Sequence, residues 1–140
     1  MEDSLIGYFI PFRSPRLADL HRPTECLHFA ETLWSKVLDR VHPRMMIALD
    51  SKTFRGLGEI NIAKGGRLVS SESFPTGWGK VTAEIDEYQL RDSAVMTVRL
   101  PHLSTFQLFS RPECEPYVST ILTKGCKHLA QVAPANWLNR

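Results

Sequence analysis

The chain has 140 residues, of which 43% are hydrophobic and 23% are charged, and its formal net charge is +2. This composition excludes an intrinsically disordered chain and fits one folded domain over residues 1–140. The small positive charge permits contact with nucleic acid but does not by itself indicate it. Three cysteines without Cys-x-x-Cys spacing argue against a disulfide framework and a zinc site.

The first residues of the chain lack the basic start and long apolar run of a secretory signal peptide. No stretch reaches the roughly 18 apolar residues of a membrane span. We therefore expect a cytoplasmic protein that has no membrane partner.

The first predicted element is a buried strand at residues 5–10, an apolar run rich in β-forming residues that Pro11 closes. Residues 11–23 are rich in proline and arginine and are expected to form an ordered loop. A helix should follow directly, because Thr24 can cap it and apolar residues recur every three or four positions as far as Val41. Pro43 is expected to end it.

Residues 45–49 form a continuous apolar run of strand length between two predicted helices, which is typical of a parallel strand that is buried on both faces. The second helix should begin at Ser51 and continue through Phe54 and Leu57. Helix, strand and helix in this order predict the α/β fold class, with a small, mostly parallel sheet flanked by helices.

The second half of the chain begins with a glycine-containing stretch, residues 65–79, whose weak periodicity predicts a loop. Residues 81–86 alternate apolar and polar side chains, as a half-exposed strand does, and residues 94–100 resemble a buried strand. These two strands are candidates for a hairpin. Residues 101–115 are expected to form a loop, and a final helix should present one apolar face that consists of Val118, Ile121, Leu122, Leu129 and Val132.

The residues that follow the strand at 94–100 are the clearest candidates for a site. Pro101 breaks the strand, so His102 and Ser104 emerge at its carboxyl end, where open α/β sheets bind ligands. A histidine can donate a charged hydrogen bond to an oxyanion, and an exposed Phe106 could stack on a base or enter a duplex. The alternatives are that His102 is an ordinary loop residue and that Phe106 belongs to the core.

This segment resembles the leaving-group loop of the uracil-DNA glycosylase superfamily, in which a strand is followed by His-Pro-Ser-Pro-Leu or a near variant. The matching residues are His102, Leu103, Ser104, Thr105 and Phe106, so that Leu103 and Thr105 replace the two prolines. The resemblance implies that His102 stabilises negative charge on the expelled base and that Ser104 contacts a DNA phosphate. It also implies that Phe106 fills the gap that a flipped nucleotide leaves.

The turn after residues 45–49 is similar to the phosphate-contacting turn of the same superfamily, with Ser51 at the matching position and Asp50 in place of a small residue. The resemblance implies that Ser51 and Lys52 bind a DNA phosphate. Free backbone amides at the helix N-terminus would favour such an anion. The alternative is that Ser51 only caps the helix.

The segment at residues 8–15 resembles a superfamily motif, Asn-x-x-Pro-Phe-Arg-Ser-Pro, whose asparagine reads the edge of the base. Tyr8 occupies the asparagine position, and a phenol can form one of the hydrogen bonds that an amide forms. Arg13 is implied to contact phosphate, although Arg13 and Arg16 are equally consistent with a solvated surface.

The resemblance covers roughly residues 5–133, and superfamily members are longer at the N-terminus. Their additional part contains the first core strand and the turn whose Asp or Asn orients the attacking water. The fold is therefore expected to resemble uracil-DNA glycosylase without that first strand. Because unpaired strand edges are unfavourable, we expect a homo-oligomer or a partner protein to cover the open edge.

Two functions follow from the resemblance. The first is a glycosylase-like protein that recognises a uracil-type base in DNA and hydrolyses its bond to the sugar or binds there. The alternative is a catalytically silent protein of the same fold that binds DNA or a partner protein as a regulator. A third interpretation is an α/β interaction domain that has no relationship to the superfamily. No cofactor is expected, and no metal either, because the histidines and carboxylates show no ligand spacing.

Overall fold

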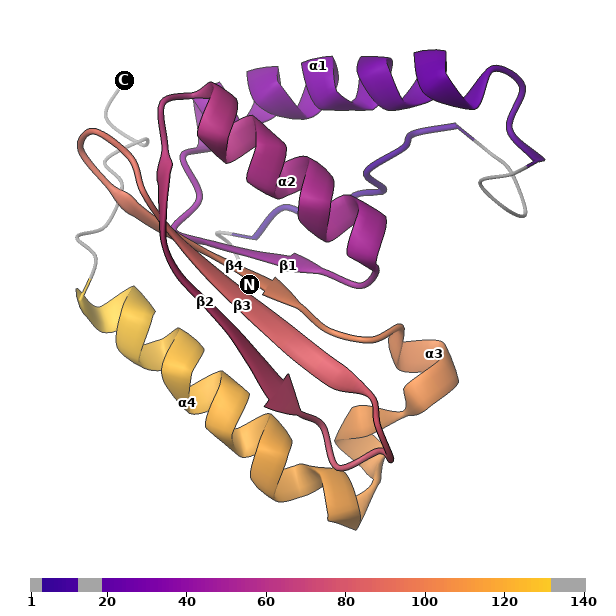
Figure 1. Cartoon of the computed structure of the whole chain (residues 1–140), viewed down its shortest axis with the longest axis vertical. Helices are drawn as coiled ribbons and strands as arrows, with labels where there is room; N and C mark the ends of the chain where they lie inside the picture. The colour runs from indigo at the N-terminus through magenta and orange to yellow at the C-terminus, as the bar shows by residue number, and fades with distance from the viewer. Residues whose placement is uncertain (1–3, 13–18, 132–140) are drawn as a thin grey trace. The chain divides into compact units, whose positions relative to one another are not determined.

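A computed structural model describes residues 4–12 and 19–131 of the chain (Figure 1). The chain divides into two compact units, Met1–Val41 and His42–Arg140.

The first unit consists of helix α1, Pro23–Val41, and an extended segment that packs on it. The indole Nε1 of Trp34 donates a 2.9 Å hydrogen bond to the backbone oxygen of Phe9, and the two rings stack with centroids 6.4 Å apart. The helix begins at Pro23, one residue before the expected cap, in the position where proline is most easily accommodated.

The prediction of a buried strand at residues 5–10 is wrong. None of these residues is in a strand, and Leu5, Ile6 and Tyr8 are 59%, 86% and 88% exposed. An apolar run becomes a buried strand only where neighbouring strands complete its backbone hydrogen bonds. This segment instead buries Phe9 against α1.

The second unit contains a four-stranded sheet in the order β1-β4-β3-β2. The strands are β1, Met45–Ala48; β2, Arg67–Pro75; β3, Thr82–Gln89; and β4, Ala94–Arg99. β1 pairs with β4 in parallel, whereas β2 with β3 and β3 with β4 are antiparallel. The α/β class is confirmed and so is the predicted hairpin of β3 and β4. The mostly parallel sheet is wrong, because one of the three pairings is parallel.

The difference arises from β2, which forms within the stretch that was expected to be a loop. Its side chains are exposed apart from Ser70 and Phe74, which are half-buried, so the strand lacks a clear alternation of its own. A register shift between Leu68 and Ser70 interrupts its pairing with β3. β2 is thus defined by its ladder with β3 and turns the chain into a three-stranded meander.

Helix α2, Ser51–Ala63, packs on one face of the sheet and contributes Phe54, Leu57 and Ile60 to the core (Figure 1). Tyr88 lies on this face, where its hydroxyl contacts the backbone of Gly58. The connection from β1 through α2 to the meander carries the chain across the sheet.

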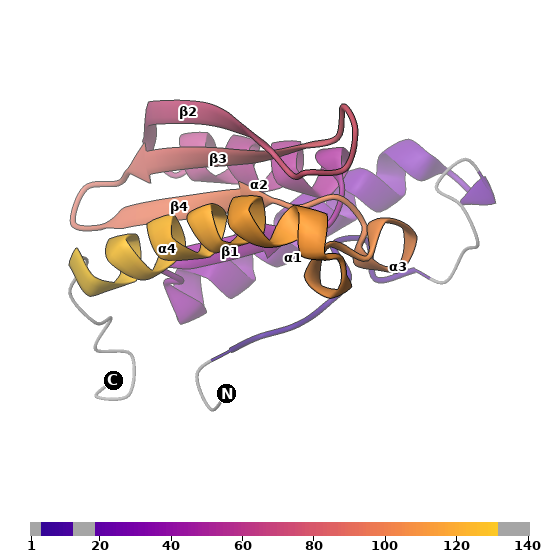
Figure 2. The same ribbon diagram turned by 90° about the horizontal axis from the view of Figure 1, so that it is seen from below.

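Helix α4, Glu115–Gln131, covers the opposite face, as the two views together show (Figures 1 and 2). Its Ile121 joins a cluster that contains Ala83, Ile85, Met96, Val98 and Leu100. Lys124 forms an ion pair with Glu72 of β2 and lies 3.9 Å from Glu87 of β3. Leu122, which was expected on the apolar face of this helix, is 51% exposed, and Val132 lies outside the described residues.

Candidate functional site

The parallel pairing of β1 with β4 brings two predicted site segments to one end of the sheet. Ala48 pairs with Arg99, and the backbone N–H of Leu100 donates a 2.9 Å hydrogen bond to the oxygen of Ala48. Both strands end within two residues of this bond. Residues 50–52 and residues 102–104 therefore leave the sheet side by side, and we call this part of the molecule the loop end.

The loop of β2 and β3, residues 76–81, reaches the same end. Nη2 of Arg99 donates to the backbone oxygen of Thr82 at 3.1 Å and binds Oε1 of Glu84 at 2.8 Å. Lys80 in this loop and Lys52 in α2 are both exposed. The loop end thus carries exposed cationic side chains from two separate connections, next to the exposed carboxylate of Asp50.

His102 and Ser104 form a hydrogen-bonded pair. The Ser104 hydroxyl lies 2.8 Å from Nδ1 of His102, both side chains are exposed, and which of the two groups donates depends on the imidazole tautomer. The pair owes its geometry to the short helix α3, Leu103–Phe106, because His102 occupies its N-cap position. The backbone oxygen of His102 accepts hydrogen bonds from the backbone N–H groups of Thr105 and Phe106. Nε2 is on the other side of the imidazole ring from the Nδ1 contact, and the His102 side chain is exposed.

Phe106, the predicted wedge, is packed into the protein. Its ring meets Trp78 edge to face with centroids 6.0 Å apart, beside a cluster of the buried residues Leu108, Cys114 and Val118. This placement favours the alternative that Phe106 belongs to the core. Insertion of the ring into a duplex would require these contacts to break.

Asp50, and not Ser51, is the N-cap of α2. Its Oδ1 accepts the backbone N–H groups of Lys52 at 2.8 Å and Thr53 at 2.9 Å, and its Oδ2 accepts the hydroxyl of Thr53 at 2.6 Å. The amides that were expected to be free for a phosphate are therefore already bonded to a carboxylate. Ser51 and Lys52 are exposed, so an anion at this position would meet their side chains.

Two further predicted residues lie outside the described part of the second unit. Tyr8 is in the first unit, where its side chain is exposed, and Arg13 lies outside the described residues.

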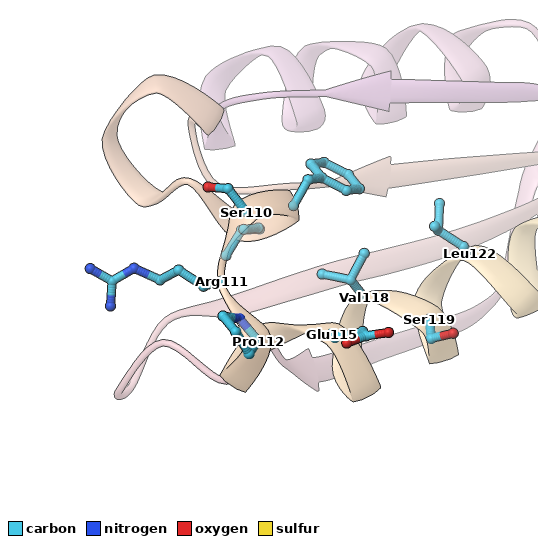
Figure 3. A pocket seen from close by; sticks show the side chains of 9 residues that line it. Ser110, Arg111, Pro112, Glu115, Val118, Ser119 and Leu122 are labelled. Atoms are coloured by element: carbon cyan, nitrogen blue, oxygen red, sulfur yellow. The ribbon is translucent and has the colours of Figure 1, made fainter.

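A shallow hollow of about 400 Å³ lies between α4 and the two 3₁₀ turns that precede it, Leu108–Ser110 and Pro112–Cys114 (Figure 3). Its lining includes Phe109, which is 58% exposed, together with Glu115, Val118, Ser119 and Leu122. The guanidinium of Arg111 lies 3.4 Å from the centre of the Trp78 ring, and Figure 3 shows this side chain pointing away from Val118 and Leu122. The sequence carries no periodic signal for this hollow, since it is made by irregular turns.

A polar layer lies between α2 and the sheet. The Tyr88 hydroxyl donates to Oδ2 of Asp86 at 3.1 Å, and burial, with the Asp86 charge adding to it, raises the pKa of Tyr88 to about 12. Thr97 pairs with Asp86 across the strands and is fully buried. The Oγ1 atom of Thr97 and the Nδ2 atom of Asn61 have no hydrogen-bond partner among the described residues.

Within residues 4–12 and 19–131, no helix combines the length and apolar character needed to cross a bilayer. The same residues contain no group of three or more histidine, cysteine, aspartate or glutamate side chains that could hold a metal ion. No protein-family model, no curated protein and no solved structure matches this chain.

Proposed function

We propose that this chain is a nucleic-acid-binding α/β domain that contacts DNA through the loop end of its sheet and does not excise bases. The parallel register of β1 and β4 supports the proposal, because the turns that carry Ser51, Lys52, His102 and Ser104 follow neighbouring strands at the same end of the sheet. These side chains offer a cation, an imidazole and hydroxyl groups from neighbouring loops. This is the kind of set that contacts phosphate oxygens along a nucleic-acid backbone.

The site favours binding over hydrolysis for two reasons. The helix amides that would hold a phosphate are bonded to Asp50, which leaves side-chain contacts to supply the affinity. Among the described residues, the imidazole of His102 forms its hydrogen bond with the hydroxyl of Ser104, and no carboxylate orients it. Catalytic histidines usually need such an orienting group.

Glycosidic hydrolysis is the second candidate, and the hydrogen bond between His102 and Ser104 supports it. If the Ser104 hydroxyl donates to Nδ1, the imidazole keeps its proton on Nε2 and can donate to a base that leaves with negative charge. This function needs an activated water as well as His102. We propose the relationship to the glycosylase superfamily only together with this second candidate function.

The test is fluorescence anisotropy with a labelled 20-mer, both single-stranded and duplex, at two salt concentrations. Lys52→Ala should weaken binding about two- to fivefold. It should also reduce, by about one, the slope of the logarithm of the binding constant against the logarithm of the salt concentration. Lys127→Ala is the matched control, because Lys127 is an exposed lysine at the opposite end of the sheet from the loop end. Its neighbour His128 contacts the backbone oxygen of Arg44, just before β1 begins. Equal effects of the two variants, or no binding of either oligonucleotide, would overturn the proposal.

The same samples separate binding from hydrolysis. Oligonucleotides that contain uracil are incubated with the protein, and abasic sites are scored by alkaline cleavage. The binding function predicts no cleavage by the wild-type protein. Cleavage that is lost in His102→Ala and retained in Lys127→Ala would establish the second candidate in its place.

A further inference from the structure

The hollow beside α4 contains a flat aromatic ring next to a short row of polar groups. Phe109, Val118 and Leu122 supply apolar surface to its lining. Glu115 and Ser119 are four residues apart on α4, so they lie on the same face of the helix, one turn apart. The volume of about 400 Å³ is sufficient for one nucleobase with its hydration.

We propose that this hollow binds one unpaired nucleobase whose Watson–Crick edge presents an amino group beside an unprotonated ring nitrogen, namely cytosine or adenine. The proposal rests on the function proposed above, since it assigns a base-binding site to the same nucleic-acid surface. The two are continuous along the chain, because residues 102–111 carry His102, Ser104, Phe109 and Arg111.

Each part of the hollow has a distinct role. The exposed ring of Phe109 stacks on the base, as aromatic side chains do in proteins that bind single strands. The Glu115 carboxylate accepts the amino group of the base, and the Ser119 hydroxyl donates to the adjacent ring nitrogen. Thymine and uracil present a carbonyl oxygen at the position of the amino group, so Glu115 repels them.

Arg111 supplies the positive charge that the hollow itself lacks and that a nucleotide phosphate requires. Its guanidinium is held against Trp78 and points away from the hollow, toward the outside of the turn (Figure 3). In this position it can bind the phosphate of a nucleotide whose base lies against Phe109. Because Trp78 fixes the side chain beforehand, little rotamer entropy is lost when the phosphate binds.

The experiment measures the affinity of 12-mers of deoxycytidine, deoxyadenosine and thymidine by fluorescence anisotropy. The wild-type protein should bind the cytidine and adenosine strands about tenfold more tightly than the thymidine strand. Glu115→Gln should bring the three affinities to within about twofold of one another, because an amide can accept or donate. Glu59→Gln, an exposed glutamate of α2, is the matched control and should keep the preference.

Phe109→Leu separates stacking from edge recognition. Loss of the ring should weaken the binding of all three strands about five- to 50-fold, while the preference for the amino-bearing bases remains. Circular dichroism and thermal unfolding establish that each variant is folded. Equal binding of the three strands by the wild-type protein, or binding of duplex alone, would overturn the assignment of the hollow and leave the proposed function standing. Failure of every nucleic acid to bind would overturn both.

Discussion

The phenolic oxygen of Tyr88 lies so close to the backbone of Gly58 that a β-carbon at position 58 would be 2.6 Å from it. The next nearest ring atom, Cζ, would be 3.5 Å away, which is ordinary van der Waals contact. Glycine at this position therefore allows α2 to approach the sheet around the tyrosine hydroxyl. The same hydroxyl is bonded to Asp86, so it cannot simply turn away.

Gly58→Ala should lower the free energy of unfolding by about 1–3 kcal/mol, because the added methyl group overpacks this contact. In a Tyr88→Phe background the same substitution should cost less by at least about 0.5 kcal/mol, since the clashing oxygen is gone. Urea unfolding of the four proteins in this double-mutant cycle measures the difference. Additive effects of the two substitutions would contradict the close approach.

Tyr88 should make the stability depend on pH in the alkaline range. Burial raises its pKa from 10.0 to about 12 in the folded protein, so between these values the unfolded chain loses a proton that the folded protein retains. The stabilising contribution is complete below pH 10 and is lost as the pH rises toward 12. Urea unfolding at pH 9 and pH 11 should show a larger drop for the wild-type protein than for Tyr88→Phe. Tyr8→Phe, at an exposed tyrosine, should behave as the wild type does.

Glu72 should produce the opposite dependence in acid. The hydrogen bond from Lys124 lowers the pKa of Glu72 below 4.5, and the charge of Lys124 contributes in the same direction. The stabilisation is present above pH 4.5 and is lost as the pH falls through the folded pKa. Glu72→Gln should therefore have a lower urea midpoint than the wild type at pH 7 but not at pH 3. If the two midpoints differ equally at both pH values, the ion pair is not the cause.

Phe106 and Phe109 are three residues apart and should respond differently to the same substitution. Phe106→Ala should lower the free energy of unfolding by about 2 kcal/mol, because it removes the contact with Trp78 and opens space beside a buried cluster. Phe109→Ala should change it by less than about 0.5 kcal/mol, because that ring is mostly exposed. Thermal unfolding of the two variants under the same conditions measures the two losses of stability. A larger loss for Phe109→Ala would reverse the roles given to the two rings.

The sequence predicted well the position of two strands that contain apolar runs, although β1 is not buried on both faces as expected, because Ile47 is 53% exposed. The run at residues 45–49 became β1, and residues 94–100 became β4, with strand ends within one residue of the expected ones. The hairpin with β3 also formed as expected. In β4 the apolar pattern matches the burial of four consecutive side chains, whereas in β1 the pattern was sufficient to place the strand but not to predict its exposure.

The failures have a physical cause in common, which is that pairing between strands cannot be read from one strand. β2 has exposed Leu68 and Val69 and was predicted to be a loop, yet eight of its nine residues pair with β3. Residues 5–10 have the better strand composition and form no strand. For the site, His102 and Ser104 could be predicted because they follow a strand. The exposure of Phe109 and the capping role of Asp50 depend on turn geometry, which the spacing of apolar residues in the sequence does not reveal.

The pairing of β1 with β4 also sets the order in which the loop end can assemble. Met45 and Met96 are 51 residues apart in the chain (96 − 45), whereas β2, β3 and β4 follow one another through short turns. Closing the longer loop loses more chain entropy, so the meander should form first and β1 should join it late. Within the described residues β1 has β4 as its sheet neighbour, and its strand contains four residues. Its amides should therefore exchange with solvent sooner than those of β3, and each opening of β1 would separate Lys52 from His102.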